Sequence, residues 1–374
     1  MRAAERGTTE DPPAAPEGEN LPADARGGGA GLALTIVVPA FNEADRLDVG
    51  MRRLQAAVDD GAVDLSTTEL VVVDDGSADG TAARATEVYA HLPHLRVCSL
   101  PANMGKGAAV RTGVSVARGG NVIFMDADMA IDPRQVPDMV TALAGADVAI
   151  ASRVLPGAVA EGDTVGRNAM GRVFNRTVNA ITGLGLGDTQ CGFKGFRTPV
   201  ARLLFHGVMV NRFAFDVGIL VLARRFGLQV AEVPVRWRNV QGSRIRPVRD
   251  AWSMVTDMVR IRMGTTAGAP MEALGVRGSG PGDPTLTAVR RAVGPTVPVL
   301  SRGDGGALAL FPLGTPAEAA AAADRLAGTV GASRVRRLAV STDQIAALAP
   351  LQVWAGTGEV TTPRGPVRLD GGEP

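Results

Sequence analysis

Two carboxylates separated by a single residue, Asp126 and Asp128, directly follow an apolar run at residues 122–125. The run is preceded by Gly119 and Gly120, and a short apolar run bounded in this way is typical of a buried strand. In open α/β sheets, ligands bind at the edge formed by the carboxyl ends of the strands. The pattern therefore indicates a metal site for a diphosphate leaving group. The alternative is a solvated turn.

Further polar residues stand where two earlier strands are predicted to end. Asn42 and Glu43 follow the first of these strands, and Asp74 and Asp75 follow the second. Acids gathered at one edge repel one another unless a cation or donor groups are present. The repulsion would be relieved if one acid accepted hydrogen bonds from a nucleoside base and another bound a metal ion. Carboxylates beside a diphosphate suit Mg²⁺ or Mn²⁺. For Asp74 and Asp75, the alternative is a turn that caps the next helix.

A glycine-rich stretch, NMGKG at residues 103–107, could also contact phosphate. It does not match the P-loop pattern, because Leu100 stands where the first glycine is needed and Gly107 stands where Ser or Thr is needed. Its backbone could still approach a phosphate or ribose with Lys106 nearby as a positive charge, or it could simply begin a helix. The dinucleotide-binding glycine pattern is absent after the first strand, which argues against NAD or FAD.

The elements that must position these residues alternate between strand and helix. Apolar runs predict strands, and apolar residues at helical spacing predict the helices between them. Short connections between such elements predict a mostly parallel sheet with right-handed crossovers. The strands are expected at residues 34–39, 69–73, 95–100, 122–125, 147–151 and 228–235, with one more after the turn at 188–196. The helices are expected at residues 43–58, 81–89, 103–117, from 132 onward, 164–181, 213–225 and 247–263.

Changes in composition divide the 374 residues into four parts. Residues 1–31, rich in Ala, Pro, Glu and Gly, are expected to form a disordered tail, and residues 32–265 a catalytic domain. A Gly/Pro/Ala-rich linker is expected at residues 266–284. Residues 285–374 are expected to form a small α+β module of unknown role. Its predicted elements are strands at 307–312 and 336–341 and a helix at 316–326.

Charge and cysteine content exclude several classes of protein. The chain has 39 Lys and Arg against 38 Asp and Glu, so bulk nucleic-acid binding is not expected. Cys98 and Cys191 lie far apart, which argues against a zinc module and fits a reducing compartment. We find neither an apolar signal segment nor a run of about 18 to 20 apolar residues. We therefore expect a cytoplasmic protein, with peripheral contact at the cytoplasmic face of the membrane through helix 247–263 if that helix is interfacial rather than core-facing.

Five motifs occur together and in order, and the series resembles family 2 inverting glycosyltransferases of the GT-A fold. The motifs are VPAFNE at residues 38–43, VDDGS at 73–77, NMGKG at 103–107, DAD at 126–128 and DTQCGFK at 188–194. Within the family, the chain is most similar to the dolichyl-phosphate β-glucosyltransferases and other polyprenyl-phosphate glycosyltransferases. The resemblance covers roughly residues 32–263. It implies a Rossmann-like, mostly parallel sheet flanked by helices.

The resemblance also implies an activity, namely transfer of a hexose from a nucleotide diphosphate sugar to a polyprenyl or dolichyl phosphate. UDP-glucose is the favoured donor and GDP-mannose the second choice, with Mg²⁺ or Mn²⁺ as cofactor. Asp126 and Asp128 would bind the metal and the donor diphosphate, and Asp188 is the candidate catalytic carboxylate. Arg153, with Arg167 as its partner, would receive the acceptor phosphate. Further binding residues come from the other motifs: Pro39, Phe41, Asn42, Glu43, Asp74, Asp75, Lys106 and Arg244.

One departure from the family pattern and the absence of a predicted membrane span leave alternatives open. Gly218 stands where the family's Phe-Asp-Val motif continues with Glu. The acceptor could be a soluble hydroxyl compound, in which case Asp188 would be needed as a general base. A phosphate acceptor is already anionic and needs positioning by arginines more than it needs a base. A third possibility is a sugar-nucleotide-binding module without catalytic activity.

Overall fold

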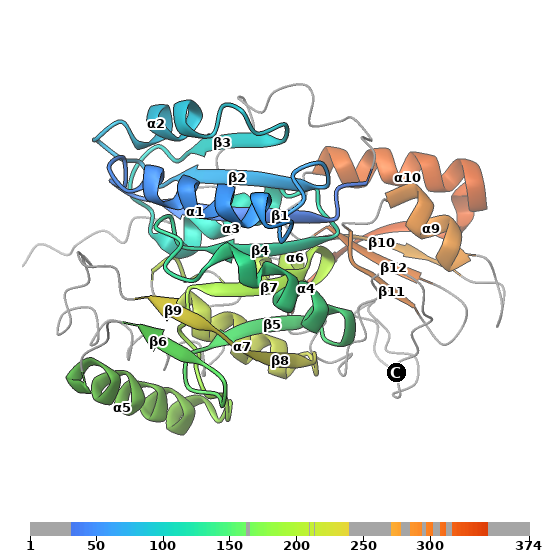
Figure 1. Ribbon diagram of the computed structural model, residues 1–374. Coiled ribbons are helices and arrows are strands. Elements are labelled where there is room, and N and C mark those ends of the chain that lie inside the picture. Colours follow the sequence, from blue (N-terminus) through green and yellow to red (C-terminus); the bar gives the residue numbers. More distant parts are fainter. Residues whose placement is uncertain are drawn as a thin grey trace, which may run out of the picture. The chain divides into compact units, whose positions relative to one another are not determined.

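The computed structural model describes residues 31–161, 165–208, 210–212, 214–238, 271–277, 285–293, 297–301, 307–311 and 316–342. Its main feature is a seven-stranded sheet with the strand order β3-β2-β1-β4-β7-β5-β8 (Figure 1). All neighbouring strands pair in parallel except β7, which runs antiparallel to β4 and β5. The strands are β1 Leu34–Ala40, β2 Thr68–Asp74, β3 Leu95–Ser99, β4 Asn121–Met125, β5 Val148–Ser152, β7 Phe193–Arg197 and β8 Val230–Pro234.

The central strands form because their sequences are apolar on both faces. Every residue of β1 and β2 is buried, as expected for parallel strands covered by helices on both sides. The register places Ala40, the last residue of β1, opposite Asp74, the last residue of β2. The mostly parallel α/β fold predicted from the sequence is confirmed, and the predicted strand ends meet at one edge of the sheet.

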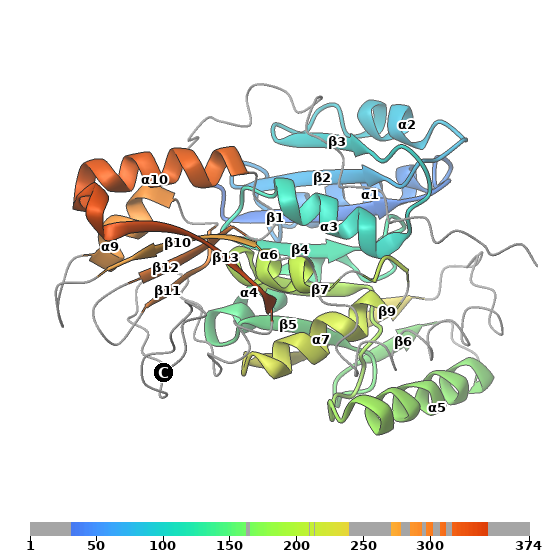
Figure 2. The same ribbon diagram turned by 180° about the vertical axis from the view of Figure 1, so that it is seen from behind.

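Helices cover both faces of the sheet (Figures 1 and 2). One buried cluster contains side chains from helices on one face, and a second contains side chains from helices on the other. The first face carries α1 Leu47–Asp59, α2 Thr81–Val88 and α4 Val136–Gly145, the last preceded by the 3₁₀ turn η2 Pro133–Gln135. The second carries α3 Lys106–Val116, α6 Thr198–Gly207 and α7 Phe215–Arg225.

Three further elements follow β5 in the chain and lie outside the main sheet. Helix α5, Val165–Thr182, agrees with the predicted helix at residues 164–181. Strands β6, Val159–Glu161, and β9, Arg236–Arg238, pair with each other in parallel. The helix predicted at residues 247–263 and the predicted tail up to residue 30 lie outside the described residues.

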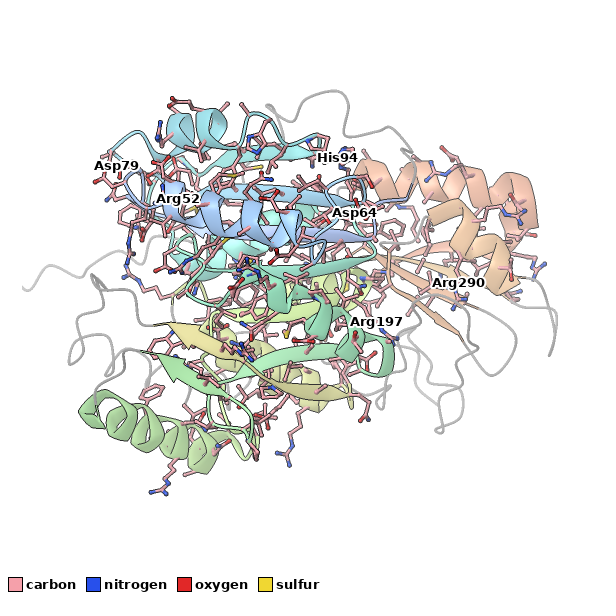
Figure 3. All side chains as sticks on the ribbon, viewed as in Figure 1. Arg52, Asp64, Asp79, His94, Arg197 and Arg290 are labelled. Carbon is pink, nitrogen blue, oxygen red and sulfur yellow. The ribbon has the colours of Figure 1, made fainter. Side chains whose placement is uncertain are left out.

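The first helix begins later than predicted, at Leu47 instead of residue 43. The backbone N–H groups of Asn42, Glu43 and Ala44 donate to side chains of the loop after β2. Those acceptors are Ser77, Thr81 and Asp79, the last of which is labelled in Figure 3. Because these tertiary contacts satisfy the amides, residues 43–46 form a turn that joins the ends of β1 and β2.

The C-terminal part forms a separate four-stranded antiparallel sheet with the order β11-β12-β10-β13. Its chain order is strand, helix, strand, strand, helix, strand, which together with the strand order is the ferredoxin-like arrangement. The elements are β10 Met271–Val276, α9 Thr285–Val293, β11 Val299–Ser301, β12 Ala307–Phe311, α10 Pro316–Val330, η3 Ala332–Arg334 and β13 Val335–Val340.

Strand β10 lies inside the stretch predicted to be a linker, so the linker prediction is wrong for Met271–Val276. The prediction failed at Gly275, because a glycine at this position made the strand resemble part of a Gly-rich linker. Far from being a connector, β10 is one of the two central strands, and it pairs with both β12 and β13.

The two faces of the C-terminal sheet pack against different partners. Leu274, Val276 and Ala309 belong to a cluster with α9 and α10. Ala273 and Leu310, whose side chains alternate with these, belong to the large cluster that contains α3, α6 and α7. The C-terminal sheet therefore shares a hydrophobic core with the back of the main sheet. No helix among the described residues is both long enough and apolar enough to cross a membrane.

Candidate active site

The ends of β1 and β2 form one corner of the candidate site. The backbone N–H of Asn42 donates to Ser77 Oγ at 2.8 Å, and the Asn42 side-chain oxygen accepts from the N–H of Ala78 at 3.0 Å. Asp74 is buried and accepts from the N–H of Ser77 at 3.1 Å. Phe41, next to Asn42 in the chain, remains 38% exposed although it is a large apolar residue. The exposed aromatic ring of Phe41 therefore lies beside the hydrogen-bonded polar loop that follows β2.

Asp75 holds the glycine-rich turn before α3 through hydrogen bonds to its backbone. Its two carboxylate oxygens accept from the backbone N–H groups of Met104 at 2.7 Å and Gly105 at 2.8 Å. Burial raises the pKa of Asp75. Gly105 has a φ of 100°, and a β-carbon there would lie 2.4 Å from the carbonyl oxygen of Asn211. Asp75 therefore fixes the tight glycine turn that places Lys106 at the start of α3.

Lys106 reaches the first acid of the Asp-Ala-Asp motif. Its ammonium group donates to Asp126 Oδ1 at 2.6 Å and lies 6.0 Å from the centre of the Phe124 ring. Burial would lower the pKa of Lys106, but the negative charges of Asp126 and Asp216 outweigh this and raise it. Gly192 packs against the other side of Asp126, since a β-carbon there would lie 2.3 Å from Asp126 Oδ2.

Asp128 is anchored by the backbone that follows it. Its Oδ1 accepts from the N–H of Ala130 at 3.0 Å, and its Oδ2 lies 3.4 Å from Arg46 Nη2. Arg53 donates to the carbonyl oxygens of Asp128 and Met129 and so holds the turn from behind. Burial, followed by the charge of Asp126, raises the pKa of Asp128.

The two acids suit a hard divalent cation. Within the described part of the chain, no group of three or more His, Cys, Asp or Glu side chains is placed to hold a metal. Mg²⁺ needs no such cage, because it keeps several waters and is commonly bound by one or two carboxylates plus substrate phosphates. Asp126 is half-exposed and uses only Oδ1 in its pair with Lys106. The donor set therefore fits an oxygen-preferring ion that arrives with a diphosphate.

Arg153 and Asp188 form a bidentate pair at the end of β5. Arg153 Nε donates to Asp188 Oδ2 at 2.6 Å, and Nη2 donates to Oδ1 at 3.0 Å. The backbone N–H groups of Arg153 and Gln190 also donate to this buried carboxylate. Burial alone would raise the pKa of Asp188, but the hydrogen bonds and charge of Arg153 outweigh it and hold the pKa below its usual range. The guanidinium also lies 5.7 Å from the Trp237 ring centre.

A second buried ion pair lies behind the site. Lys194, which is fully buried, donates to Asp216 at 3.0 Å and to the carbonyl oxygen of Cys191 at 2.7 Å. Its ammonium lies 5.7 Å from the Phe124 ring centre, close to the distance found for Lys106. Burial raises the pKa of Asp216. The acids at this edge are thus balanced by lysines and arginines that the motif spacing alone did not pair.

The chain is similar to several known proteins. The pattern of Glycosyl transferase family 2 matches residues 35–205. A dolichyl-phosphate beta-glucosyltransferase of Dictyostelium discoideum is 34% identical over 245 residues, covering 62% of this chain and 74% of that protein. The enzyme of the same name from Homo sapiens is 32% identical, covering 63% of this chain and 76% of that one.

The chain belongs to glycosyltransferase family 2. This agrees with the resemblance drawn from the five motifs. Among solved structures, glucosyl-3-phosphoglycerate synthase from Mycobacterium tuberculosis, in complex with Mn²⁺, UDP and glucosyl-3-phosphoglycerate, is 22% identical. It matches with a TM-score of 0.46, covering 65% of this chain and 84% of that one.

Two residues of the glycosyltransferase that the sequence did not single out hold the loop before Asp188. Asn175 of α5 donates to the carbonyls of Leu186 and Gly187 and accepts from Thr189. Asn179, one turn later, donates to Leu186 and accepts from the N–H of Gly185. The signal available in the sequence was their spacing, because two asparagines four residues apart lie on one helix face.

The side chains of two predicted site residues, Arg167 and Arg244, lie outside what the structure describes. Arg244 lies outside the described residues. Arg167 lies on α5, but its side chain is outside the described part of the chain. The partner found for Arg153 is Asp188. Gly218, where the family motif has an acid, is buried in α7 two residues after Asp216.

Proposed function

We propose that this glycosyltransferase moves glucose from a nucleotide diphosphate sugar to the phosphate of a polyprenyl or dolichyl phosphate, with inversion at the anomeric carbon. UDP-glucose is the first donor to test and GDP-mannose the second. The names and 31–34% identities of several relatives support this acceptor. The observation that carries the proposal is Arg153, whose guanidinium is fixed by Asp188 and whose side chain is still 36% exposed.

The surroundings of Arg153 suit a lipid phosphate. Asp188 engages Nε and Nη2, which leaves Nη1 to receive an acceptor phosphate oxygen. Val154 and Val159 follow in the chain and are 54% and 44% exposed. With Phe41, they are the exposed large apolar side chains of the described residues. A cation followed by exposed apolar side chains matches a phosphate attached to an isoprenoid chain.

The state of Asp188 favours a phosphate acceptor over a hydroxyl acceptor. A hydroxyl nucleophile needs a base to take its proton, whereas a phosphate oxygen is already anionic near neutral pH. Asp188 accepts four hydrogen bonds, and its pKa is held low by Arg153, so it is a weak base. In the proposed step, the phosphate oxygen bonds to the anomeric carbon. The bond from that carbon to the diphosphate breaks, and the nucleoside diphosphate keeps the electron pair.

The donor is held by the earlier strand ends. Phe41 stacks on the base, Asn42, Glu43 and Asp74 line the nucleoside, and Lys106 contacts the diphosphate. Asp126 and Asp128 hold Mg²⁺ or Mn²⁺, which when bound supplies positive charge against the charge developing on the leaving diphosphate. Lys106 then exchanges its contact with Asp126 for one with a phosphate oxygen. Arg167 and Arg244 remain candidates for the acceptor phosphate and the diphosphate, respectively.

Phe41→Ala is expected to raise the KM for the nucleotide sugar about tenfold and to leave kcat unchanged. Stacking of a base on an aromatic ring contributes about 1–3 kcal/mol, and the contact is the same in the ground and transition states. Phe41→Tyr keeps the ring and should behave as the wild type. The measurement is steady-state kinetics over a range of donor concentrations. Equal KM values for Phe41→Ala and Phe41→Tyr would remove the base-stacking role.

One assay tests the proposed function. The full chain is incubated with labelled UDP-glucose or GDP-mannose, Mg²⁺ or Mn²⁺, and polyprenyl phosphate in detergent, with the matching polyprenol as control acceptor. We expect label from UDP-glucose in the organic phase, and only with the phosphorylated lipid. Label confined to water-soluble products would instead support a hydroxyl acceptor. Binding of UDP-glucose without transfer to any acceptor would support a non-catalytic module.

A further inference from the structure

The C-terminal ferredoxin-like sheet carries a groove that the proposed transfer reaction does not use. Helices α9 and α10 lie side by side on one face of this sheet and border an open groove of about 540 Å³. That volume falls within the usual range of small-ligand sites, about 300 to 1,000 Å³. The residues that line it are Thr287, Ala288, Arg291, Ala292, Arg325 and Thr329.

The two helices contribute matching side chains. Thr287 and Arg291 stand four residues apart on α9, and Arg325 and Thr329 stand four residues apart on α10. Residues at this spacing project from one face of a helix, one turn apart. Each wall of the groove therefore offers one guanidinium and one hydroxyl, while the alanines Ala288 and Ala292 leave space between them.

The two charged side chains that line the groove, Arg291 and Arg325, are both positive, and Arg325 is held in place by a hydrogen bond. Among the residues that the structure describes, no acidic side chain lines the groove. Arg325 Nε donates to the carbonyl oxygen of Ala292 at 2.9 Å, which fixes the guanidinium and leaves both Nη groups for another acceptor. Arg291 forms no hydrogen bond or ion pair within the described residues.

We propose that the groove between α9 and α10 is a binding site for a phosphate-bearing anion. Paired guanidinium forks recognise phosphate through parallel N–H···O bonds, and the Thr287 hydroxyl supplies a further donor, whereas Thr329 Oγ1 already donates to the carbonyl oxygen of Arg325 at 3.0 Å. The phosphate comes either from a free phosphorylated small molecule or from the headgroup of an anionic lipid. The site is separate from the pair Arg153 and Asp188 and does not depend on the proposed transfer reaction.

The test is hydrogen–deuterium exchange of the full chain, measured by mass spectrometry, because it reports on individual helices. Inorganic pyrophosphate is the soluble probe. Vesicles of equal parts phosphatidylcholine and phosphatidylglycerol are the lipid probe, with pure phosphatidylcholine vesicles as their control. We expect slower exchange in peptides from α9 and α10. Protection by pyrophosphate identifies a free phosphate ligand, and protection by the anionic vesicles alone identifies a lipid headgroup.

A variant series separates a built site from general positive charge. The double variant Arg291→Gln with Arg325→Gln should weaken binding of the effective probe about tenfold or more, because two charge-assisted contacts are lost. Arg277→Gln removes an exposed charge at the end of β10 and should leave binding unchanged. If the double variant does not fold, the single variant Arg291→Gln serves, since Arg291 makes no internal bond. No protection by either probe, or equal weakening by Arg277→Gln, overturns the proposal.

Discussion

Asp128→Asn is expected to lower sugar transfer to every acceptor by roughly a hundredfold or more, because a metal that neutralises a leaving diphosphate contributes several kcal/mol. Asparagine has the shape of aspartate and can still accept from the N–H of Ala130, so the turn after β4 should persist. What is lost is one of the two negative charges placed for the metal. Chelation with EDTA should abolish transfer by the wild-type chain, and added Mg²⁺ or Mn²⁺ should restore it.

The measurement is kcat as a function of metal concentration, with thermal unfolding followed in parallel. Asp132→Asn provides the control, because Asp132 lies in the same segment and caps the turn at Arg134 without facing the site. It should leave both kcat and the metal dependence unchanged. Wild-type transfer by Asp128→Asn, or transfer that persists in EDTA, would contradict the metal assignment.

Arg153→Ala is expected to lower transfer to polyprenyl phosphate by about 10- to 100-fold, the effect of losing a charge-assisted contact to phosphate. The KM for the donor should not change, because the proposed donor site lies at the ends of β1, β2 and β4. Arg153→Lys keeps the charge but loses the fork that fits Asp188, and it should give an intermediate rate. The assay compares a lipid phosphate with a soluble hydroxyl acceptor. Equal losses on both acceptors would remove the reason for placing Arg153 at the acceptor.

Asp188→Asn distinguishes positioning from base catalysis. If Asp188 orients Arg153, the KM for the lipid phosphate should rise while the pH profile of kcat keeps its shape. If Asp188 is a base, kcat should fall and lose the acidic limb of its pH profile. Arg176→Ala, which removes an exposed charge from α5, is the control for both variants and should have no effect on either quantity.

Much of the main sheet and of the site could be predicted because both depend on local patterns. Strands β1, β2 and β4 are apolar runs that end in polar residues, and that pattern requires no knowledge of the rest of the fold. Since parallel strands share one carboxyl edge, their terminal residues had to meet. The position of Asp74, Asp126 and Asp128 at the carboxyl edge of the sheet could therefore be predicted from the sequence.

Other elements could not be predicted because tertiary packing determines them. Helix α6 was missed, since eight of its ten residues are buried and only Arg202 and His206 mark its polar face. The pairing of Arg153 with Asp188 joins residues 35 positions apart. It depends on the antiparallel insertion of β7 beside β5, which sequence spacing does not reveal. The same holds for Lys106 and Asp126, which meet across a glycine turn fixed by Asp75.

The hydrophobic core shared by the C-terminal sheet and α6 has a practical consequence for anyone expressing this protein. A shortened gene that stops after residue 265 looks like a natural catalytic fragment. It would remove Met271, Leu310 and Val340 from the buried cluster that they share with Leu204 and Phe205 of α6. Such a fragment would expose an apolar surface, and we expect it to aggregate into inclusion bodies. For crystallisation and kinetic measurements, the expressed chain should keep at least residues 32–342.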